Sequence, residues 1–390
     1  MFIMIKRELE KNLKETAKQF RVVALTGPRQ SGKTTLLKDI FKGYKYFNLE
    51  SLDTQNMVEA DKAGFIRSNN KIIIDEIQKM PELMSMIQSV VDERNDKGDF
   101  IISGSENLLL SEKISQSLAG RASYSKLLPL SISELKKAKL LKKSFEEQIL
   151  FGFYPAIYSQ KIDAEKYYDN YIQTYLERDL RNMQNIQNLN LFRKFIALLA
   201  GRIGQLVNYE SIANDVGVSR NTIENWISIL EASFLVFRLQ PYYENFGKRN
   251  IKSAKIYFTD VGLACYLLTI ASVEELEKHY LRGGLFENMC ILEIYKHILN
   301  NGINANLFFY RDSSGKEVDL LIKKGLKIIP IEIKSSSSFS SEFLKGIDYW
   351  KNLNKKDNEK GFVIYNGESL KEIKGVKLLN WKDIETIFEN

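Results

Sequence analysis

One stretch near the start of the chain constrains the fold more than any other. Residues 21–35 read Arg-Val-Val-Ala-Leu-Thr-Gly-Pro-Arg-Gln-Ser-Gly-Lys-Thr-Thr, so that an apolar, β-branched run leads into Gly27-x-x-x-x-Gly32-Lys33-Thr34. The next residues, 36–40, have the apolar spacing of the first turns of a helix. Strand, glycine-containing loop and helix in this order predict a phosphate-binding loop, because a glycine-rich turn that merely opens a helix does not require the full spacing.

The residues of this loop suit an anionic ligand. Glycines allow backbone N–H groups to curl around phosphate oxygens, and the N-terminus of a helix adds partial positive charge. We expect Lys33 to reach the β- and γ-phosphates and the Thr34 hydroxyl to hold Mg²⁺. The predicted phosphate-binding residues are Gly27, Pro28, Arg29, Gln30, Ser31, Gly32, Lys33, Thr34 and Thr35.

A second apolar run ends in two carboxylates. Residues 71–78 read Lys-Ile-Ile-Ile-Asp-Glu-Ile-Gln, which is typical of a strand buried on both faces inside a parallel sheet. Ligands bind at the carboxyl ends of such strands. We therefore expect Asp75 to hold Mg²⁺ through its water shell and Glu76 to act as the base that polarises the attacking water. The alternative is an acidic pair at the start of a helix.

A third buried run, residues 99–105, ends in small polar residues. Ser105, or Asn107 just beyond it, is a candidate contact for the γ-phosphate or for the attacking water, and the alternative is an ordinary turn. Arg121 follows Leu118-Ala-Gly and precedes a predicted strand at residues 122–128. Arg121 is a candidate cationic stabiliser of the transferred phosphoryl group, acting in its own chain or from a neighbouring subunit, and the alternative is a surface arginine.

Together these motifs resemble the AAA-type ATPases of a large prokaryotic family whose members carry a C-terminal domain of unknown function. The resemblance continues through Gly152-Phe-Tyr-Pro155 and residues 175–180 and covers essentially the whole chain, although Phe151 stands where a second glycine is common in the family. It implies a P-loop ATPase fold that uses ATP and Mg²⁺. The motifs that carry it are Gly-Pro-Arg-Gln-Ser-Gly-Lys-Thr-Thr at 27–35, Ile-Asp-Glu-Ile-Gln at 74–78, Ser-Gly-Ser at 103–105 and Leu-Ala-Gly-Arg at 118–121.

Composition bounds the remaining classes. The net charge of +7 permits a polyanionic partner, and two isolated cysteines and two histidines exclude a disulfide framework and a Cys- or His-based metal cluster. No apolar run approaches the roughly 20 residues that span a membrane. Acidic residues follow at once in the N-terminal stretch, which is unlike a signal peptide, so we expect a cytoplasmic protein without membrane contact.

The middle of the chain predicts a helical connector followed by a winged-helix-like domain. Residues 163–200 have helical apolar spacing, and their tyrosine stripe (Tyr167, Tyr168, Tyr171 and Tyr175) is interpreted as core. Residues 208–230 have the residue pattern of a helix-turn-helix. In this pattern Arg220, Asn221 and Asn225 face outward from the second helix. A strand at 234–239 and a basic hairpin at 248–255 complete a winged-helix-like pattern. DNA is the predicted partner, and the alternative is docking of a protein.

The C-terminal part carries a second set of charged residues on predicted strands. Asp319 lies on one strand, and Glu332 and Lys334, two residues apart on the next, share a face. This Asp-x(n)-Glu-x-Lys pattern resembles the restriction-endonuclease-like (PD-(D/E)XK) superfamily, and Glu287 matches the acidic residue on its first helix. The resemblance implies a Mg²⁺ site formed by Glu287, Asp319 and Glu332, with Glu332 and Lys334 as catalytic residues. Many members of that superfamily have lost catalytic residues, so whether this chain cleaves DNA stays open.

The predicted fold class is α/β with four parts. They are an AAA-type parallel-sheet ATPase domain at 1–145, a helical connector or lid at 146–200, a winged-helix-like domain at 201–260 and a nuclease-like α/β domain at 261–390. The predicted function is Mg²⁺-dependent ATP hydrolysis coupled to action on DNA. The alternative is a nucleotide-dependent switch that docks a protein partner and carries an inactive nuclease-like domain. The oligomeric state stays open.

Overall fold

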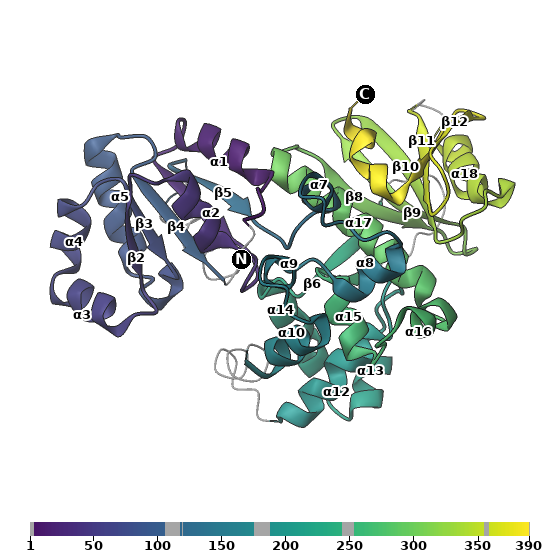
Figure 1. Ribbon diagram of the computed structural model, residues 1–390, viewed down its shortest axis with the longest axis horizontal. Helices are drawn as coiled ribbons and strands as arrows, with labels where there is room; N and C mark the ends of the chain where they lie inside the picture. The colour runs from purple at the N-terminus through teal and green to yellow at the C-terminus, as the bar shows by residue number, and fades with distance from the viewer. Residues whose placement is uncertain are drawn as a thin grey trace.

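The N-terminal part of the chain forms a parallel sheet. The computed structural model describes residues 4–105, 118, 120–174, 188–243, 253–354 and 359–389. Within these ranges, five strands lie in the order β2-β3-β4-β1-β5, and every neighbouring pair is parallel. The strands are β1 (Val22–Thr26), β2 (Lys45–Asn48), β3 (Ile72–Asp75), β4 (Phe100–Gly104) and β5 (Ala122–Lys126). The predicted α/β class with a parallel sheet in the N-terminal part is confirmed (Figure 1).

Helices cover both faces of this sheet because its central strands are apolar on both sides. Val23, Leu25 and Ile73 pack with α1 (Leu9–Ala17) and α2 (Lys33–Ile40) on one face. Val22, Ala24 and Ile74 pack on the other face with α3, α4 and α5 (Figure 1). These three helices span Leu52–Ala60, Lys62–Ser68 and Leu83–Arg94, and the short 3₁₀ helix η1 spans Ile77–Lys79.

A helical region follows the sheet and lies mostly to its lower right in Figure 1. The side chains of Tyr167, Tyr168 and Tyr171 are buried in its core, which confirms the interpretation of that part of the tyrosine stripe, whereas Tyr175 lies outside the described residues. The described helices are α7 (Ile132–Lys137), α8 (Phe145–Phe151), α9 (Pro155–Ser159), α10 (Ala164–Tyr171), α12 (Leu189–Ala200), α13 (Tyr209–Val216), α14 (Arg220–Ala232), α15 (Val261–Leu267) and α16 (Val273–Lys278).

The C-terminal part is built on a mixed sheet. Its eight described strands lie in the order β12-β13-β11-β10-β9-β8-β6-β7. They are β6 (Val236–Pro241), β7 (Lys255–Phe258), β8 (Asn306–Arg311), β9 (Glu317–Lys324), β10 (Lys327–Lys334), β11 (Gly361–Tyr365), β12 (Leu370–Ile373) and β13 (Val376–Asn380). The helical elements of this part are α17 (Arg282–Asn301), η3 (Ser341–Leu344), α18 (Lys345–Leu353) and η4 (Trp381–Phe388).

Two features join regions that the sequence separates. Strand β6 pairs in parallel with β8, so the predicted winged-helix-like region and the C-terminal module share one sheet. Helices α15 and α16, which follow residue 260, pack against α8 of the predicted connector. The long helix α17 contacts α1, α8 and β10 and therefore touches all the main regions of the described chain (Figure 1).

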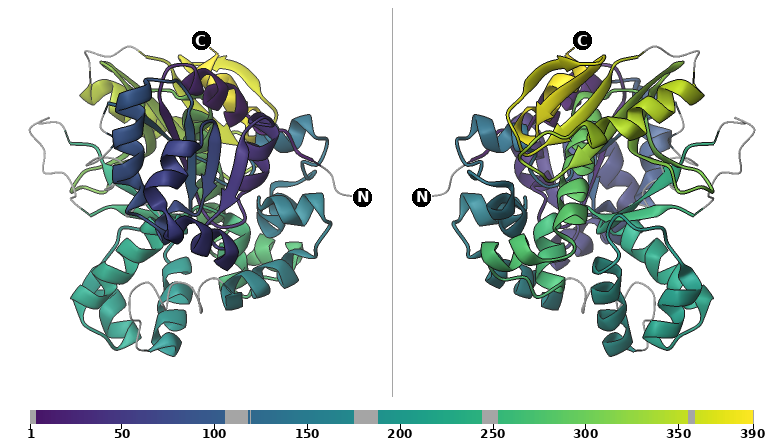
Figure 2. Two further views of the ribbon diagram at one scale, coloured as in Figure 1. Left: turned by 90° about the vertical axis from the view of Figure 1, so that its left-hand side faces the viewer. Right: turned by 90° about the vertical axis from the view of Figure 1, so that its right-hand side faces the viewer.

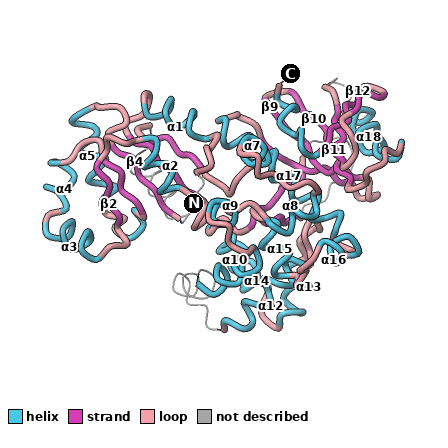
Figure 3. Tube along the Cα trace, viewed as in Figure 1, coloured by secondary structure: helices cyan, strands magenta, loops and turns pink. Residues whose placement is uncertain are grey.

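The two sheets lie at opposite ends of the molecule, with helices between them (Figure 3). The side views show the helices of the teal region, α12 and α13, extending away from both sheets (Figure 2). Among the helices in the described ranges, none combines the length and the apolar character needed to cross a bilayer.

Candidate functional site

The predicted phosphate-binding residues form one loop between β1 and the start of α2. Gly27 has φ +154°, and a Cβ atom at this position would lie only 2.1 Å from the carbonyl oxygen of Leu127. The close approach of Gly27 to the segment that follows β5 therefore requires glycine. Gly32 precedes α2 with φ +93°, and Gln30 also has a positive φ of 61°. The backbone therefore curls tightly from the carboxyl end of β1 to the N-terminus of α2, the arrangement that cradles phosphates.

Lys33 lies folded over this loop. Its Nζ donates hydrogen bonds to the carbonyl oxygens of Gly27 and Pro28, at 2.9 and 3.0 Å, and only 6% of the residue is exposed. Burial lowers the pKa of this ammonium group, and the nearby Glu76 and Asp75 oppose that effect. Because a phosphate ester would be a stronger acceptor than two carbonyl groups, Lys33 is placed to exchange these bonds for a bound nucleotide.

Thr34 and Asp75 meet at the carboxyl edge of the sheet. Thr34 Oγ1 donates to Asp75 Oδ2 at 2.5 Å, and the hydroxyl of Tyr46 donates to the same oxygen at 2.9 Å. Ser103 donates to the other carboxylate oxygen. Burial and the neighbouring Asp75 raise the pKa of Tyr46. A hydroxyl beside a carboxylate is a set of hard oxygen donors, so these residues fit Mg²⁺ bound to a nucleotide.

Glu76 lies one residue beyond the strand and is held by two neighbours. Its backbone is left-handed, with φ 58°, and its Oε2 accepts hydrogen bonds from the Gln78 amide and, at 3.1 Å, from Ser105 Oγ. The structure thus brings together Asp75, Glu76 and Ser105, which come from the ends of adjacent strands. Asn107 lies outside the described residues.

Arg121 lies at the other edge of the sheet, which corrects the expectation that it acts on the phosphates bound to its own chain. It immediately precedes β5, and its carbonyl oxygen accepts from the N–H of Val22 at the start of β1. Because β1 and β5 are parallel, the starts of both strands lie together at the end of the sheet farthest from Gly27. The Arg121 side chain donates to Asp92 Oδ1 at 2.5 Å.

The C-terminal sheet carries a second polar cluster. Lys334 Nζ lies 2.9 Å from Asp319 Oδ2 and 2.7 Å from Glu332 Oε2, so the three predicted residues converge on neighbouring strands β9 and β10. Burial and the charge of Asp319 raise the pKa of Glu332 well above its ordinary value. The Oε1 atom of Glu332 is buried and has no hydrogen-bond partner in the described part of the chain.

Glu287 does not complete a metal site with Asp319 and Glu332, which corrects the expected three-carboxylate set. Its Oε1 accepts from Lys255 Nζ at 3.1 Å and from the Tyr257 hydroxyl. Lys255 also lies 2.5 Å from Glu317 Oε1. Within the residues that the structure describes, no three His, Cys, Asp or Glu side chains are grouped closely enough to hold a metal ion.

The helix-turn-helix pattern corresponds to α13 and α14. Ser219 caps α14 by accepting from the backbone N–H of Thr222, and Gly217 ends α13 in a left-handed conformation. The guanidinium of Arg220 pairs with Glu224 at 2.7 Å and with Glu210 at 2.5 Å, so its charge is balanced locally. The strands β6 and β7 are antiparallel, and residues 244–252, which include most of the predicted basic hairpin, lie outside the described ranges.

The sequence assigned no role to Tyr46 and Gln78, which the structure places in contact with Asp75 and Glu76, respectively. It placed Lys255 in the predicted basic hairpin, but this lysine is buried and bridges Glu287 and Glu317. Tyr46 lies within β2, and Gln78 lies in η1, three residues beyond the end of β3, so the available signal was closeness in sequence to Asp75 for Gln78 alone. Lys255 is joined to its partners only by the pairing of distant strands.

Three family models match the chain. Residues 19–136 match an AAA domain, residues 142–284 match a domain of unknown function (DUF8612), and residues 282–384 match a second domain of unknown function (DUF4143). The AAA match contains the phosphate-binding loop, Asp75 and Glu76, and the DUF4143 match contains Asp319, Glu332 and Lys334.

Two relatives match this chain over most of its length. An uncharacterized protein of Mycobacterium tuberculosis is 28% identical over 340 residues, which cover 85% of this chain and 74% of that protein. An uncharacterized protein of Methanocaldococcus jannaschii is 28% identical across 97% of this chain and 87% of its own length.

Parts of this chain also match solved structures, two of which are a Walker-type ATPase and a DnaA bound to AMPPCP. A Walker-type ATPase of Pyrococcus abyssi is 16% identical with a TM-score of 0.47, covering 68% of this chain and 96% of that one. The AMPPCP-bound DnaA of Aquifex aeolicus is 15% identical with a TM-score of 0.30, covering 57% and 85%.

Proposed function

We propose that this chain, which carries an AAA domain near its N-terminus and a DUF4143 domain near its C-terminus, binds ATP with Mg²⁺ at residues 27–35 and hydrolyses it. The observation that carries this proposal is the contact between Thr34 Oγ1 and Asp75 Oδ2 at 2.5 Å, with Glu76 adjacent. Both residues lie at the carboxyl edge of a parallel sheet, where the phosphate-binding loop also lies.

Each group has a role in hydrolysis. The loop N–H groups and the N-terminus of α2 stabilise the phosphate oxygens, and Lys33 adds a positive charge at the β- and γ-phosphates. Thr34 and Asp75 would hold Mg²⁺, which neutralises charge on those oxygens. Glu76 orients the attacking water and accepts its proton as the oxygen bonds to the γ-phosphorus and ADP leaves. Ser105 and Gln78 hold the Glu76 carboxylate in place.

The test is ATP turnover by purified protein and by two lysine variants. Lys33→Ala should lose at least about 100-fold of the turnover, because electrostatic stabilisation by one such group is worth that much. Lys42→Ala is the control, since Lys42 is an exposed lysine just beyond the same helix and pairs with Asp39. Equal turnover in Lys33→Ala and wild type would exclude hydrolysis at this loop.

A second candidate function concerns DNA and is supported by the cluster of Asp319, Glu332 and Lys334. Glu332 Oε1 is buried beside Lys334 and has no hydrogen-bond partner among the described residues, a costly arrangement that a divalent cation bound at this oxygen would relieve. The test is nicking of duplex DNA with Mg²⁺ or Mn²⁺, using Glu332→Gln and a control at Glu342→Gln, an exposed glutamate. Inactivity of the wild type across both metals would reject cleavage.

DNA is also the partner that we propose for α13 and α14, on the strength of the exposed Asn221 and the half-exposed Thr222 at the start of α14 and of the net charge of +7. The neutralised Arg220 favours the alternative, in which the same helices dock a protein and the chain acts as a nucleotide-dependent switch. The measurement is DNA binding over a range of salt concentrations together with ATP turnover with and without DNA. Phosphate contacts require binding that weakens steeply with salt.

A further inference from the structure

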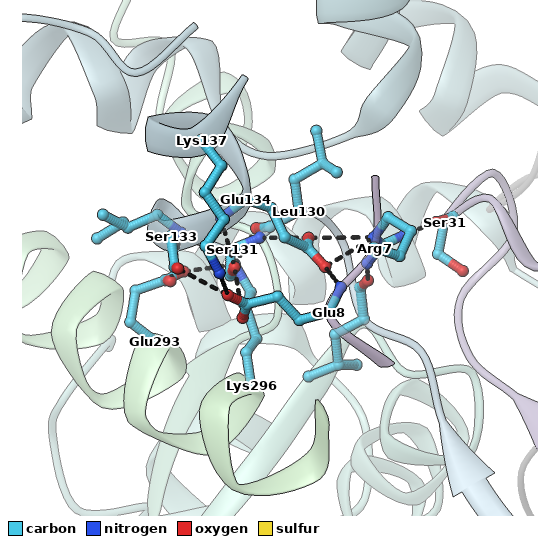
Figure 4. A network of polar contacts seen from close by, with 12 residues as sticks. Arg7, Glu8, Ser31, Leu130, Ser131, Ser133, Glu134, Lys137, Glu293 and Lys296 are labelled. Carbon is cyan, nitrogen blue, oxygen red and sulfur yellow. Dashed lines mark hydrogen bonds and ion pairs between the residues drawn. The ribbon is translucent and has the colours of Figure 1, made fainter. Parts of the chain in front are cut away.

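Residues 128–134, which run from just beyond β5 into the first turn of α7, are held from two sides by buried charged side chains (Figure 4). Arg7, which precedes α1, holds this segment from the side of the phosphate-binding loop. Glu293 and Lys296 on α17 hold it from the side of the C-terminal sheet. The segment therefore lies between the nucleotide site and the helix that carries Glu287.

All three guanidinium nitrogens of Arg7 donate hydrogen bonds in this network. Nε donates to both carboxylate oxygens of Glu134, at 3.1 and 3.0 Å. One terminal nitrogen donates to the carbonyl oxygen of Ser31 and the other to that of Leu128, both at 2.6 Å. Arg7 is only 7% exposed, and a buried planar group that is bonded through each of its three nitrogens has little freedom to move. It fixes the Ser31 carbonyl, which belongs to the phosphate-binding loop, relative to Glu134.

The α17 side of the network is equally buried. Glu293 Oε2 accepts from the backbone N–H of Ile132 at 2.6 Å. Lys296 Nζ donates to the carbonyl oxygen of Leu130 and to Glu293 Oε1, both at 2.7 Å. Lys296 also lies 3.9 Å from the ring centroid of Phe153. Because unpaired buried charges are costly, a movement of residues 130–132 must be followed by α17.

A bound phosphate would disturb the loop at the end of this network. Pro28 O accepts from Lys33 Nζ at 3.0 Å and from the Ser31 N–H at 3.3 Å. A Lys33 side chain that turned to a bound phosphate would withdraw one of these two donors from Pro28 O, in the same turn that carries the Ser31 N–H. The contact between Ser31 and Arg7 is thus sensitive to occupancy, which supplies the difference between two states that coupling requires.

We propose that a nucleoside triphosphate in the phosphate-binding loop changes the position of α17, and with it Glu287, through Arg7, Glu134 and residues 128–132. The inference rests on the proposed ATP binding and adds its regulatory consequence. Glu287 is six residues before Glu293 on the same helix, a rise of about 9 Å, so a shift of α17 moves the carboxylate that Lys255 and Tyr257 contact. By linkage, changes on α17 alter nucleotide affinity in return.

The experiment measures amide hydrogen exchange and nucleotide affinity in the full chain, using AMPPCP with Mg²⁺ as the probe. In the wild type, AMPPCP should slow exchange at residues 27–40 and also alter it at residues 282–301. The double variant Glu293→Gln/Lys296→Met removes both charges of the buried pair together, which limits the loss of stability. It should lose the response of residues 282–301 and change AMPPCP affinity by about five- to tenfold, as typical coupling energies imply.

The control is Glu342→Gln/Lys345→Met, which removes an exposed Glu–Lys pair with the same spacing of three residues. Should the α17 variant fail to fold, Arg7→Lys carries the test, since lysine keeps the charge but cannot bond Glu134 and both carbonyl groups at once. Protection of residues 27–40 without any response at 282–301 in the wild type would overturn the coupling alone. Absence of protection at residues 27–40 would instead overturn the proposed ATP binding and the coupling that rests on it.

Discussion

The hydroxyl of Thr34 donates a 2.5 Å hydrogen bond to the carboxylate of Asp75, across 41 residues of sequence. This bond joins the first turn of α2 to the end of β3 and places two oxygen donors next to the loop that bends around Lys33. Glu76 follows Asp75 directly but is bonded to a different pair of neighbours, Gln78 and Ser105. The two carboxylates therefore have separate environments. That of Asp75 suits a cation, and that of Glu76 suits the attacking water.

Replacement of Glu76 by glutamine should separate binding from hydrolysis. Glu76→Gln keeps the size of the side chain and lets ATP bind, but removes the base, which is worth about 10²- to 10⁴-fold in rate. Single-turnover hydrolysis and fluorescent-nucleotide affinity measure the two effects. Glu59→Gln, on exposed helix α3, is the control. A variant that loses binding and turnover in equal measure would contradict the assigned role.

Tyr46→Phe should weaken the response to Mg²⁺. The Tyr46 hydroxyl donates to Asp75 Oδ2 at 2.9 Å and orients that carboxylate. Loss of such a supporting hydrogen bond costs about tenfold or more in metal affinity, so the Mg²⁺ concentration for half-maximal ATP turnover should rise by that factor. Tyr44→Phe is a matched control, because the Tyr44 hydroxyl bonds the carbonyl oxygen of Gly98 instead. Identical Mg²⁺ titrations of the two variants would count against the assignment.

Arg121→Ala should leave ATP turnover within about twofold of the wild type, because Arg121 lies at the edge of the sheet opposite the phosphate-binding loop and pairs with Asp92 at the surface. The measurement is kcat over a range of protein concentrations. A loss of 100-fold or more, of the size that a cationic stabiliser supplies, would show that Arg121 acts on a neighbouring subunit.

Gly152→Ala should destabilise the helical region by about 3 kcal/mol or more, because overpacking and a forbidden backbone conformation add together. Gly152 has φ +65°, and an added Cβ would lie 1.8 Å from the Tyr168 hydroxyl and 2.6 Å from Asp260 Oδ1. The free energy of unfolding in denaturant is the readout. Gly43→Ala is the control, since nothing lies within 4 Å of a Cβ there. Equal stability of both variants would refute the steric argument.

Asp312→Asn should lower stability at neutral pH and lose that effect in acid. Asp312 accepts from Ser314 and from the Tyr349 hydroxyl, and although burial opposes the change, these bonds lower its pKa from 3.8 to about 2. A lowered pKa stabilises the folded state above pH 3.8, and this contribution disappears as the pH falls toward 2. The variant should be less stable by about 1–2 kcal/mol at pH 7.

The check is the difference in the free energy of unfolding between wild type and Asp312→Asn, measured at several pH values from 7 downward. The difference should be constant to about pH 4 and then shrink. A difference that grows as the pH falls would mean that the carboxylate is destabilising in the folded state.

Adjacent residues determined the nucleotide site, and the sequence alone therefore predicts it. The left-handed conformation at Gly32 depends on the local chain, and an apolar run such as residues 72–74 must be buried on both faces, which places Asp75 and Glu76 at its end. The parallel sheet follows from the same runs, since strand–helix–strand connections of this length give parallel neighbours.

Strand pairing between distant segments decided the rest. The direction of β5 beside β1 placed Arg121 away from the loop, and the pairing of β6 with β8 brought Lys255 from the predicted hairpin to Glu287 and Glu317. Arg7 reached Glu134 only because α1 folds against the sheet. A local sequence pattern indicates which backbone conformation a residue adopts and which face of its helix or strand is buried. The partner of a charged side chain depends instead on the order and direction of the strands, which no short stretch of sequence specifies.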